Sequence, residues 1–141
     1  MKAIQFSAFV GIAALALGLS SCGDTKTSLA EKEQSLVLKA ADALTDCKDK
    51  DDIRDTADEL YDIAAELMEL SIEARLAEGD CIKEEANRTA KENKELREKL
   101  KDMRKTTAET WQDACKYINE DKELSASQYL QKAIRSVEHA F

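Results

Sequence analysis

The sequence has no proline, one histidine, one tryptophan and only four glycines in 141 residues. After residue 21 the glycines that remain are Gly23 and Gly79, so the chain has almost none of the residues that form turns between strands. This shortage argues against a sheet protein. Alanine, leucine, glutamate and lysine dominate instead, which is the composition of long helices.

Charge is almost absent from the N-terminal segment, where Lys2 is the only charged residue before Asp24. A positive start, an apolar middle and then small residues are the layout of an export signal. The apolar stretch of about 19 residues is barely long enough to span a bilayer, and Gly11 and Gly18 interrupt it. Cleavage is therefore favoured over permanent insertion.

The segment Leu19-Ser20-Ser21-Cys22 resembles the cleavage site of bacterial lipoprotein precursors, which has an aliphatic residue, two small residues and a cysteine. The resemblance covers only the leader. It implies removal of residues 1–21, a diacylglyceryl thioether on Cys22 and a lipidated tether over residues 22–27. Two or three acyl chains hold a protein stably on a membrane. The alternative is an ordinary signal peptide with an incidental cysteine.

The resemblance also implies a place in the cell envelope. In the best-known sorting scheme of this class, aspartate after the lipidated cysteine retains the protein at the inner membrane. Because Gly23 occupies that position here, the outer membrane is favoured if the host has one.

Acidic residues outnumber basic ones in the part of the chain that follows the leader. Without residues 1–21 there are 20 basic and 29 acidic residues, a formal charge of −9. Such a chain is repelled by phosphate backbones and by anionic headgroups, which argues against nucleic acid as a partner. Residues 46–69 hold ten acids and three bases, whereas residues 83–105 hold nine bases and six acids. The opposite charges predict antiparallel packing of the two helices that carry these segments. Solvated helix faces are the simpler explanation of such charge runs.

The spacing of apolar residues divides residues 28–141 into four helices, roughly over 29–47, 52–79, 82–117 and 125–141. Gly79 is expected to end the second helix, and Ser125 with Gln128 is expected to begin the last as a capping box. The prediction is an all-α domain, an elongated antiparallel three- to four-helix bundle.

The third helix has the most regular pattern, with alternating steps of four and three residues. The positions are Ile82, Ala86, Thr89, Asn93, Leu96, Leu100, Met103, Thr107, Thr110, Ala114 and Tyr117. They predict one long, coiled-coil-like helix of about 55 Å with a polar seam. That seam could set the register of a homo-oligomer, or the middle of the helix could be half exposed.

Three further cysteines, Cys47, Cys81 and Cys115, are candidates for a disulfide, because an exported protein meets an oxidising compartment. A bridge requires Cα atoms within about 7 Å of each other. In an up-and-down bundle Cys47 and Cys115 lie at the same end, whereas Cys81 lies at the other. The candidate pair is therefore Cys47 with Cys115, and three buried free thiols are the alternative.

Motifs for metal binding or catalysis are missing from the sequence. His139 is the only histidine, so neither a zinc site nor a di-iron site is predicted. There is no glycine-rich phosphate loop and no nucleophile motif, and we expect no cofactor and no enzymatic activity. The acidic turn over residues 46–58 resembles a calcium loop in charge only.

These observations predict a lipid-anchored protein of the cell envelope that acts as a non-catalytic interaction or structural module. The acidic second helix or the polar seam of the third helix is the expected docking surface for a protein partner or a second copy. The alternative is a periplasmic carrier that holds a metal ion or a small apolar ligand between its helices.

Overall fold

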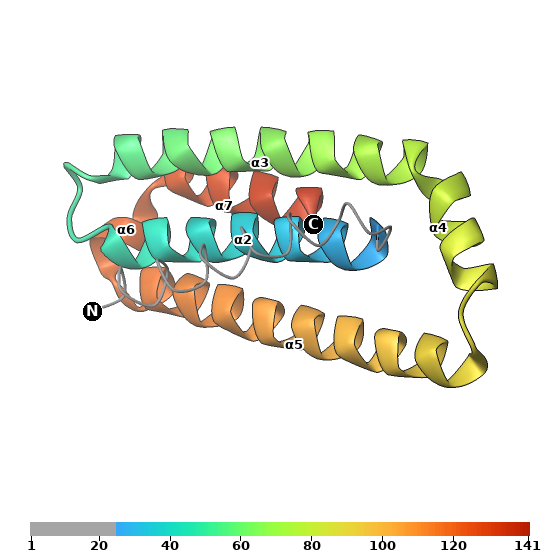
Figure 1. Ribbon diagram of the computed structural model, residues 1–141. Helices are drawn as coiled ribbons and strands as arrows, with labels where there is room; N and C mark the ends of the chain where they lie inside the picture. Colours follow the sequence, from blue (N-terminus) through green and yellow to red (C-terminus); the bar gives the residue numbers. More distant parts are fainter. Residues whose placement is uncertain (1–24) are drawn as a thin grey trace.

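The computed structural model describes residues 25–141, and this part of the chain folds into six helices and no strand (Figure 1). The predicted all-helical bundle is confirmed. The predicted signal peptide over residues 1–21 and the predicted lipidation site Cys22 lie outside the described residues. The helices, in chain order, are α2 (Thr25–Asp46), α3 (Ile53–Leu76), α4 (Glu78–Ala86), α5 (Ala90–Glu120), α6 (Lys122–Ala126) and α7 (Gln128–Ala140).

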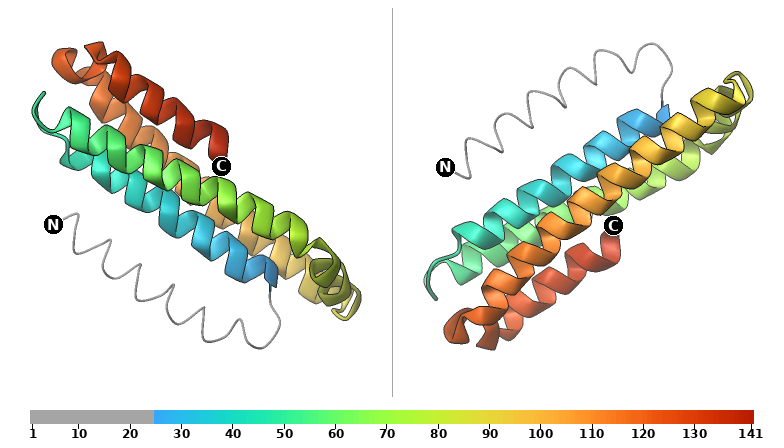
Figure 2. Two further views of the ribbon diagram at one scale, coloured as in Figure 1. Left: turned by 90° about the horizontal axis from the view of Figure 1, so that it is seen from above. Right: turned by 90° about the horizontal axis from the view of Figure 1, so that it is seen from below.

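The four main helices, α2, α3, α5 and α7, alternate in direction along the bundle (Figure 1). α3 packs on α2 and α7, and α5 packs on α2, whereas α3 and α5 make almost no contact with each other. Figure 2 shows the reason, since α3 and α5 occupy opposite corners of the bundle. The short helix α4 crosses the end of the bundle between them.

The predicted packing of residues 46–69 against residues 83–105 is therefore wrong. The two segments run in opposite directions, but α2 and α7 separate them. Exposed ion pairs contribute little free energy, whereas α2 offers apolar surface to both neighbours. Burial of that surface decides which helices touch.

The hydrophobic core occupies only one half of the bundle, near the loop of residues 47–52. Its buried members are Val37, Ala40, Ala41, Leu44, Cys47, Ala57, Leu60, Ile63, Ala64, Leu67, Trp111, Ala114, Ile118, Leu124, Leu130, Ala133, Ile134 and Val137. Between residues 71 and 106, by contrast, Cys81 is the one buried side chain. The half with the core is called the packed end below, and the half around α4 is called the open end.

Helix boundaries differ from the predicted ones at both ends of the bundle. α2 begins at Thr25, so residues 25–27 of the expected tether are helical. Gly79 lies inside α4 and does not end a helix, and a Cβ atom placed on it would meet nothing within 4 Å.

The expected third helix is interrupted before Ala90. Thr89 accepts a hydrogen bond from the Glu92 backbone N–H at 3.2 Å, and the Glu92 carboxylate accepts one from the Thr89 N–H at 2.7 Å. This capping box starts α5 as a new helix. The hydrogen bond from the Thr89 backbone also lowers the pKa of Glu92.

The buried stripe of α5 departs from the predicted seam in the second half of the helix. Trp111 and Ile118 are buried, whereas the predicted Thr110 is exposed. An α-helix turns once every 3.6 residues, so a strict seven-residue repeat drifts from the contact face of a straight helix. The structure accommodates this drift with one extra step of four residues, from Thr107 to Trp111.

The caps of the last two helices are Asp121 and Ser127. The Asp121 carboxylate accepts the Glu123 and Leu124 N–H groups at 2.9 and 3.0 Å and begins α6. The Ser127 hydroxyl accepts the Leu130 N–H at 3.2 Å and begins α7. The predicted cap, Ser125, lies inside α6 instead.

Candidate functional site

A groove of about 690 Å³ runs along the open end between α2, α3 and α5. It exists because α7 has 13 residues whereas α3 has 24 and α5 has 31, so the fourth corner of the bundle is filled over only part of its length. Phe141, directly after α7, lines the groove. Figure 2 shows the C-terminus ending partway along the bundle.

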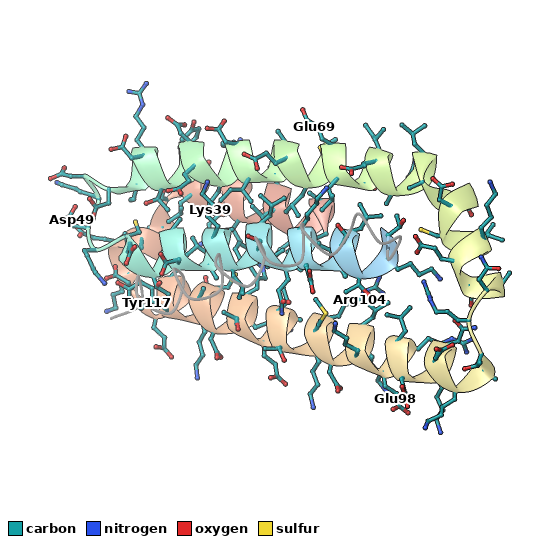
Figure 3. The ribbon with its side chains drawn as sticks, viewed as in Figure 1. Lys39, Asp49, Glu69, Glu98, Arg104 and Tyr117 are labelled. Carbon is teal, nitrogen blue, oxygen red and sulfur yellow. The ribbon has the colours of Figure 1, made fainter. Side chains whose placement is uncertain are left out.

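The lining of the groove combines apolar and charged side chains. Leu70 of α3, with Leu100 and Met103 of α5, supplies apolar surface, and Glu33 of α2 and Arg104 of α5 supply charge. Arg104 extends from α5 towards α2 (Figure 3). A groove with this volume and this mixed lining fits an amphipathic ligand or a helix with one apolar face.

A cluster of polar contacts, separate from the groove, holds α4 against the beginning of α2. The backbone N–H of Thr25 donates to both carboxylate oxygens of Glu84, at 3.0 and 2.8 Å, and the Thr25 hydroxyl donates to Glu84 at 2.6 Å. Lys26 forms an ion pair with Glu85 at 3.2 Å. A carboxylate at the first N–H of a helix also complements the helix dipole. These contacts, called the α2–α4 junction below, fix the start of α2 beside α4.

Large apolar side chains are exposed at the open end. The exposed fractions are 60% for Met68, 57% for Ile72, 83% for Leu76 and 61% for Ile82. Met68, Ile72 and Leu76 follow the buried Leu60 and Leu67 at helical spacing, and Ile82 is the first position of the predicted seam, yet all four side chains are exposed. α7 covers the earlier part of α3, where Tyr129 packs on Tyr61 with ring centroids 5.7 Å apart, and it ends at Ala140.

Acidic side chains cover the outer surface of α3. Its exposed carboxylates are Asp55, Asp58, Glu59, Asp62, Glu66, Glu69 and Glu73, and Figure 3 shows Glu69 pointing away from the bundle. Lys32 pairs with Glu73 at 3.2 Å. The Tyr129 hydroxyl donates to Asp58 at 2.6 Å, and this hydrogen bond raises the pKa of Tyr129. This surface is called the acidic face below.

The three described cysteines are free thiols, and the predicted bridge between Cys47 and Cys115 is not formed. α5 does approach Cys47, because the Tyr117 hydroxyl donates to the Cys47 carbonyl at 3.1 Å. Cys115 precedes Tyr117 by two residues and therefore points to the other side of the helix. Its sulfur lies 4.0 Å from the Glu138 carboxylate of α7.

All three thiols lie where ionisation is unfavourable. Burial raises the pKa of Cys47 and the pKa of Cys81 above their ordinary values. Burial, together with the neighbouring Glu138 carboxylate, raises the pKa of Cys115 to about 12. Thiols in this state are weak nucleophiles.

His139 is exposed in the last turn of α7. Over residues 25–141 no three His, Cys, Asp or Glu side chains come together in a way that could hold a metal ion. No helix in this range has the length and the apolar content that crossing a bilayer requires.

Comparison of the chain with protein-family models, curated proteins and solved structures gives no significant match.

Proposed function

We propose that this protein is a lipid-anchored, non-catalytic interaction module of the cell envelope. The observation that carries the proposal is the match of Leu19-Ser20-Ser21-Cys22 to the lipoprotein cleavage site. Cys22 precedes the first described helical residue, Thr25, by three positions. An anchor at Cys22 would therefore hold the bundle close to the membrane surface, and Gly23 favours the outer membrane where the host has one.

The anchor is tested by replacing Cys22 with alanine. We expect the unmodified chain to partition into detergent and to carry the added mass of a diacylglyceryl group. Cys22→Ala should lose both properties, because no other thiol stands at the cleavage site. Cys115→Ala serves as the matched control and should behave like the unmodified chain. Detergent partition and mass that are unchanged in Cys22→Ala would overturn the proposal.

The acidic face of α3 supports a role in binding a protein with a basic surface. Its carboxylates extend along one side of the helix and are exposed. Complementary charges of this kind speed association and orient the partner. They also repel nucleic acid.

The binding role is tested by cross-linking in intact cells. Neutralising the acidic face with Asp62→Asn, Glu66→Gln and Glu69→Gln should reduce the yield of cross-linked complex. The control removes the same number of exposed carboxylates from α5, at Glu98, Glu109 and Asp113. Equal losses in both variants would show that net charge, and not the acidic face, governs the association.

The groove supports a second candidate function, that of a carrier for a small apolar ligand. Its volume of about 690 Å³ falls within the range of small-molecule sites. A ligand that binds there should raise the unfolding temperature, and Met103→Trp, which narrows the groove, should remove that increase. A panel of fatty acids and divalent cations that leaves the unfolding temperature unchanged would contradict this candidate.

A further inference from the structure

We propose that the open end of the bundle contacts the membrane directly, through the elbow formed by the last turn of α3 and the first turns of α4. In this arrangement Leu76 and Ile82 enter the interfacial region of the bilayer, and Arg75 and Lys83 meet anionic headgroups. The proposal rests on the lipid anchor at Cys22. It adds a second attachment and a fixed orientation of the bundle.

The elbow lies close to the proposed anchor. The α2–α4 junction binds Thr25 to Glu84 and Lys26 to Glu85, so the start of α2 lies beside the elbow. Three residues of chain reach at most about 11 Å, and Cys22 precedes Thr25 by three residues. Acyl chains on Cys22 would therefore bring the bilayer surface to the same end of the molecule as Ile82.

The elbow also exposes apolar side chains to solvent. Leu76 is 83% exposed and Ile82 is 61% exposed. Both are aliphatic, and both would lose unfavourable contact with water on entering the interface. At the packed end the large aliphatic residues Leu44, Leu60 and Leu130 are buried within the bundle.

The balance of charge differs between the two ends of the bundle. Residues 75–99, at the open end, hold seven acidic and seven basic residues, whereas residues 46–59, at the packed end, hold seven acidic and three basic residues. Anionic headgroups repel the packed end more strongly. Arg75 and Lys83 form no ion pair within residues 25–141, and their long side chains can reach headgroups beside a buried apolar neighbour.

Position, apolar exposure and charge together favour a bundle that stands upright on the membrane. The elbow faces the lipid, and the loop of residues 47–52 points away from it. Most of the acidic face of α3 then lies above the bilayer, where a soluble partner can approach it.

Depth-dependent fluorescence quenching tests the elbow. The lipidated protein carrying Ile82→Trp is reconstituted into vesicles of phosphatidylethanolamine and phosphatidylglycerol with brominated acyl chains. Its matched control carries Met68→Trp, at a position of nearly the same exposure about 12 Å from Leu76 along α3. Trp111, which is 3% exposed, stays in place as the reference.

We expect the tryptophan at position 82 to lose fluorescence to the bromine atoms and to shift its emission to shorter wavelength. The tryptophan at position 68 should show neither change. Adding Arg75→Glu and Lys83→Glu to Ile82→Trp should reduce the quenching without releasing the protein from the vesicles, because the acyl chains still hold it.

The outcomes separate this proposal from the proposed function. Protein that floats with the vesicles while position 82 is not quenched, or while positions 68 and 82 are quenched equally, would overturn the elbow and leave the anchor intact. A dimer in detergent in which both positions are shielded from an aqueous quencher would assign the apolar stripe to a second copy, and would also overturn it. Protein that carries no lipid and fails to float would overturn both.

Discussion

At the scale of single residues, the surroundings of Cys115 in the folded protein make ionisation of its thiol unfavourable. Its thiol is partly buried beside the Glu138 carboxylate, and its pKa is raised to about 12 from an ordinary 9.0. Between these two pH values the unfolded chain loses the thiol proton while the folded chain keeps it. The resulting stability is fully present below about pH 9 and is lost as the pH rises towards 12.

The test is urea unfolding over this alkaline range. The free energy of unfolding should fall with rising pH in the unmodified protein and fall less steeply in Cys115→Ala. Other groups titrate over the same range, so the difference between the two proteins is the quantity to compare. Parallel curves would show that Cys115 is as easily ionised in the folded state as in the unfolded state.

Residue burial was predictable where a neighbouring helix covers the apolar stripe. Val37 and Leu44 of α2, and Ala57 and Leu60 of α3, recur at helical spacing and are buried. The same spacing failed at Leu76, because periodicity identifies the apolar face of a helix but does not reveal whether another helix covers it. The contact between Thr25 and Glu84 joins residues 59 positions apart, and no local pattern indicates it.

At the scale of secondary-structure elements, two serines are alternative caps for α7, and a pair of substitutions distinguishes between them. Ser127→Ala should lower the free energy of unfolding by about 1 kcal/mol, because the Leu130 N–H loses its acceptor. Ser125→Ala, two residues earlier inside α6, should have a much smaller effect. Denaturant unfolding of both variants measures the difference. A larger loss for Ser125→Ala would place the start of α7 at the capping box expected from the sequence.

The sequence pattern predicted the presence of the main helices better than it predicted the residues at which they begin and end. The absence of proline and the apolar spacing indicated all four main helices. The interruption before α5 was missed, although its signal is present in the sequence as Thr89 followed three residues later by Glu92. The heptad pattern continues across that boundary and concealed it.

At the scale of the whole molecule, the two ends of the bundle differ in how tightly they are packed. Buried side chains cluster at the packed end, whereas α4 and the first half of α5 contribute few. Local opening costs less free energy where few apolar contacts must break. Amide hydrogens in residues 90–106 should therefore exchange with solvent faster than those in residues 107–118 of the same helix.

Hydrogen exchange followed by mass spectrometry measures this contrast between two segments of the same helix. Uniform protection along α5 would contradict this prediction.

The order of the helices around the bundle was the least predictable feature. Charge suggested that α3 and α5 would be neighbours, but they lie at opposite corners. Surface charges add little to packing in water, and α4 is long enough to carry the chain across the end of the bundle. The sequence therefore indicated the four main helices and their directions, but neither the short helices α4 and α6 nor the placement of α3 and α5 at opposite corners.

The place of α2 in the bundle has a mechanical consequence. α2 touches α3, α4 and α5, and it is also the helix nearest to the proposed anchor. A force applied to the molecule while the acyl chains stay in the bilayer would enter at Thr25 and act along the axis of α2. The load would then act as shear between α2 and its neighbours. The contacts of α2 with α3 and with α5 would bear that load at the same time.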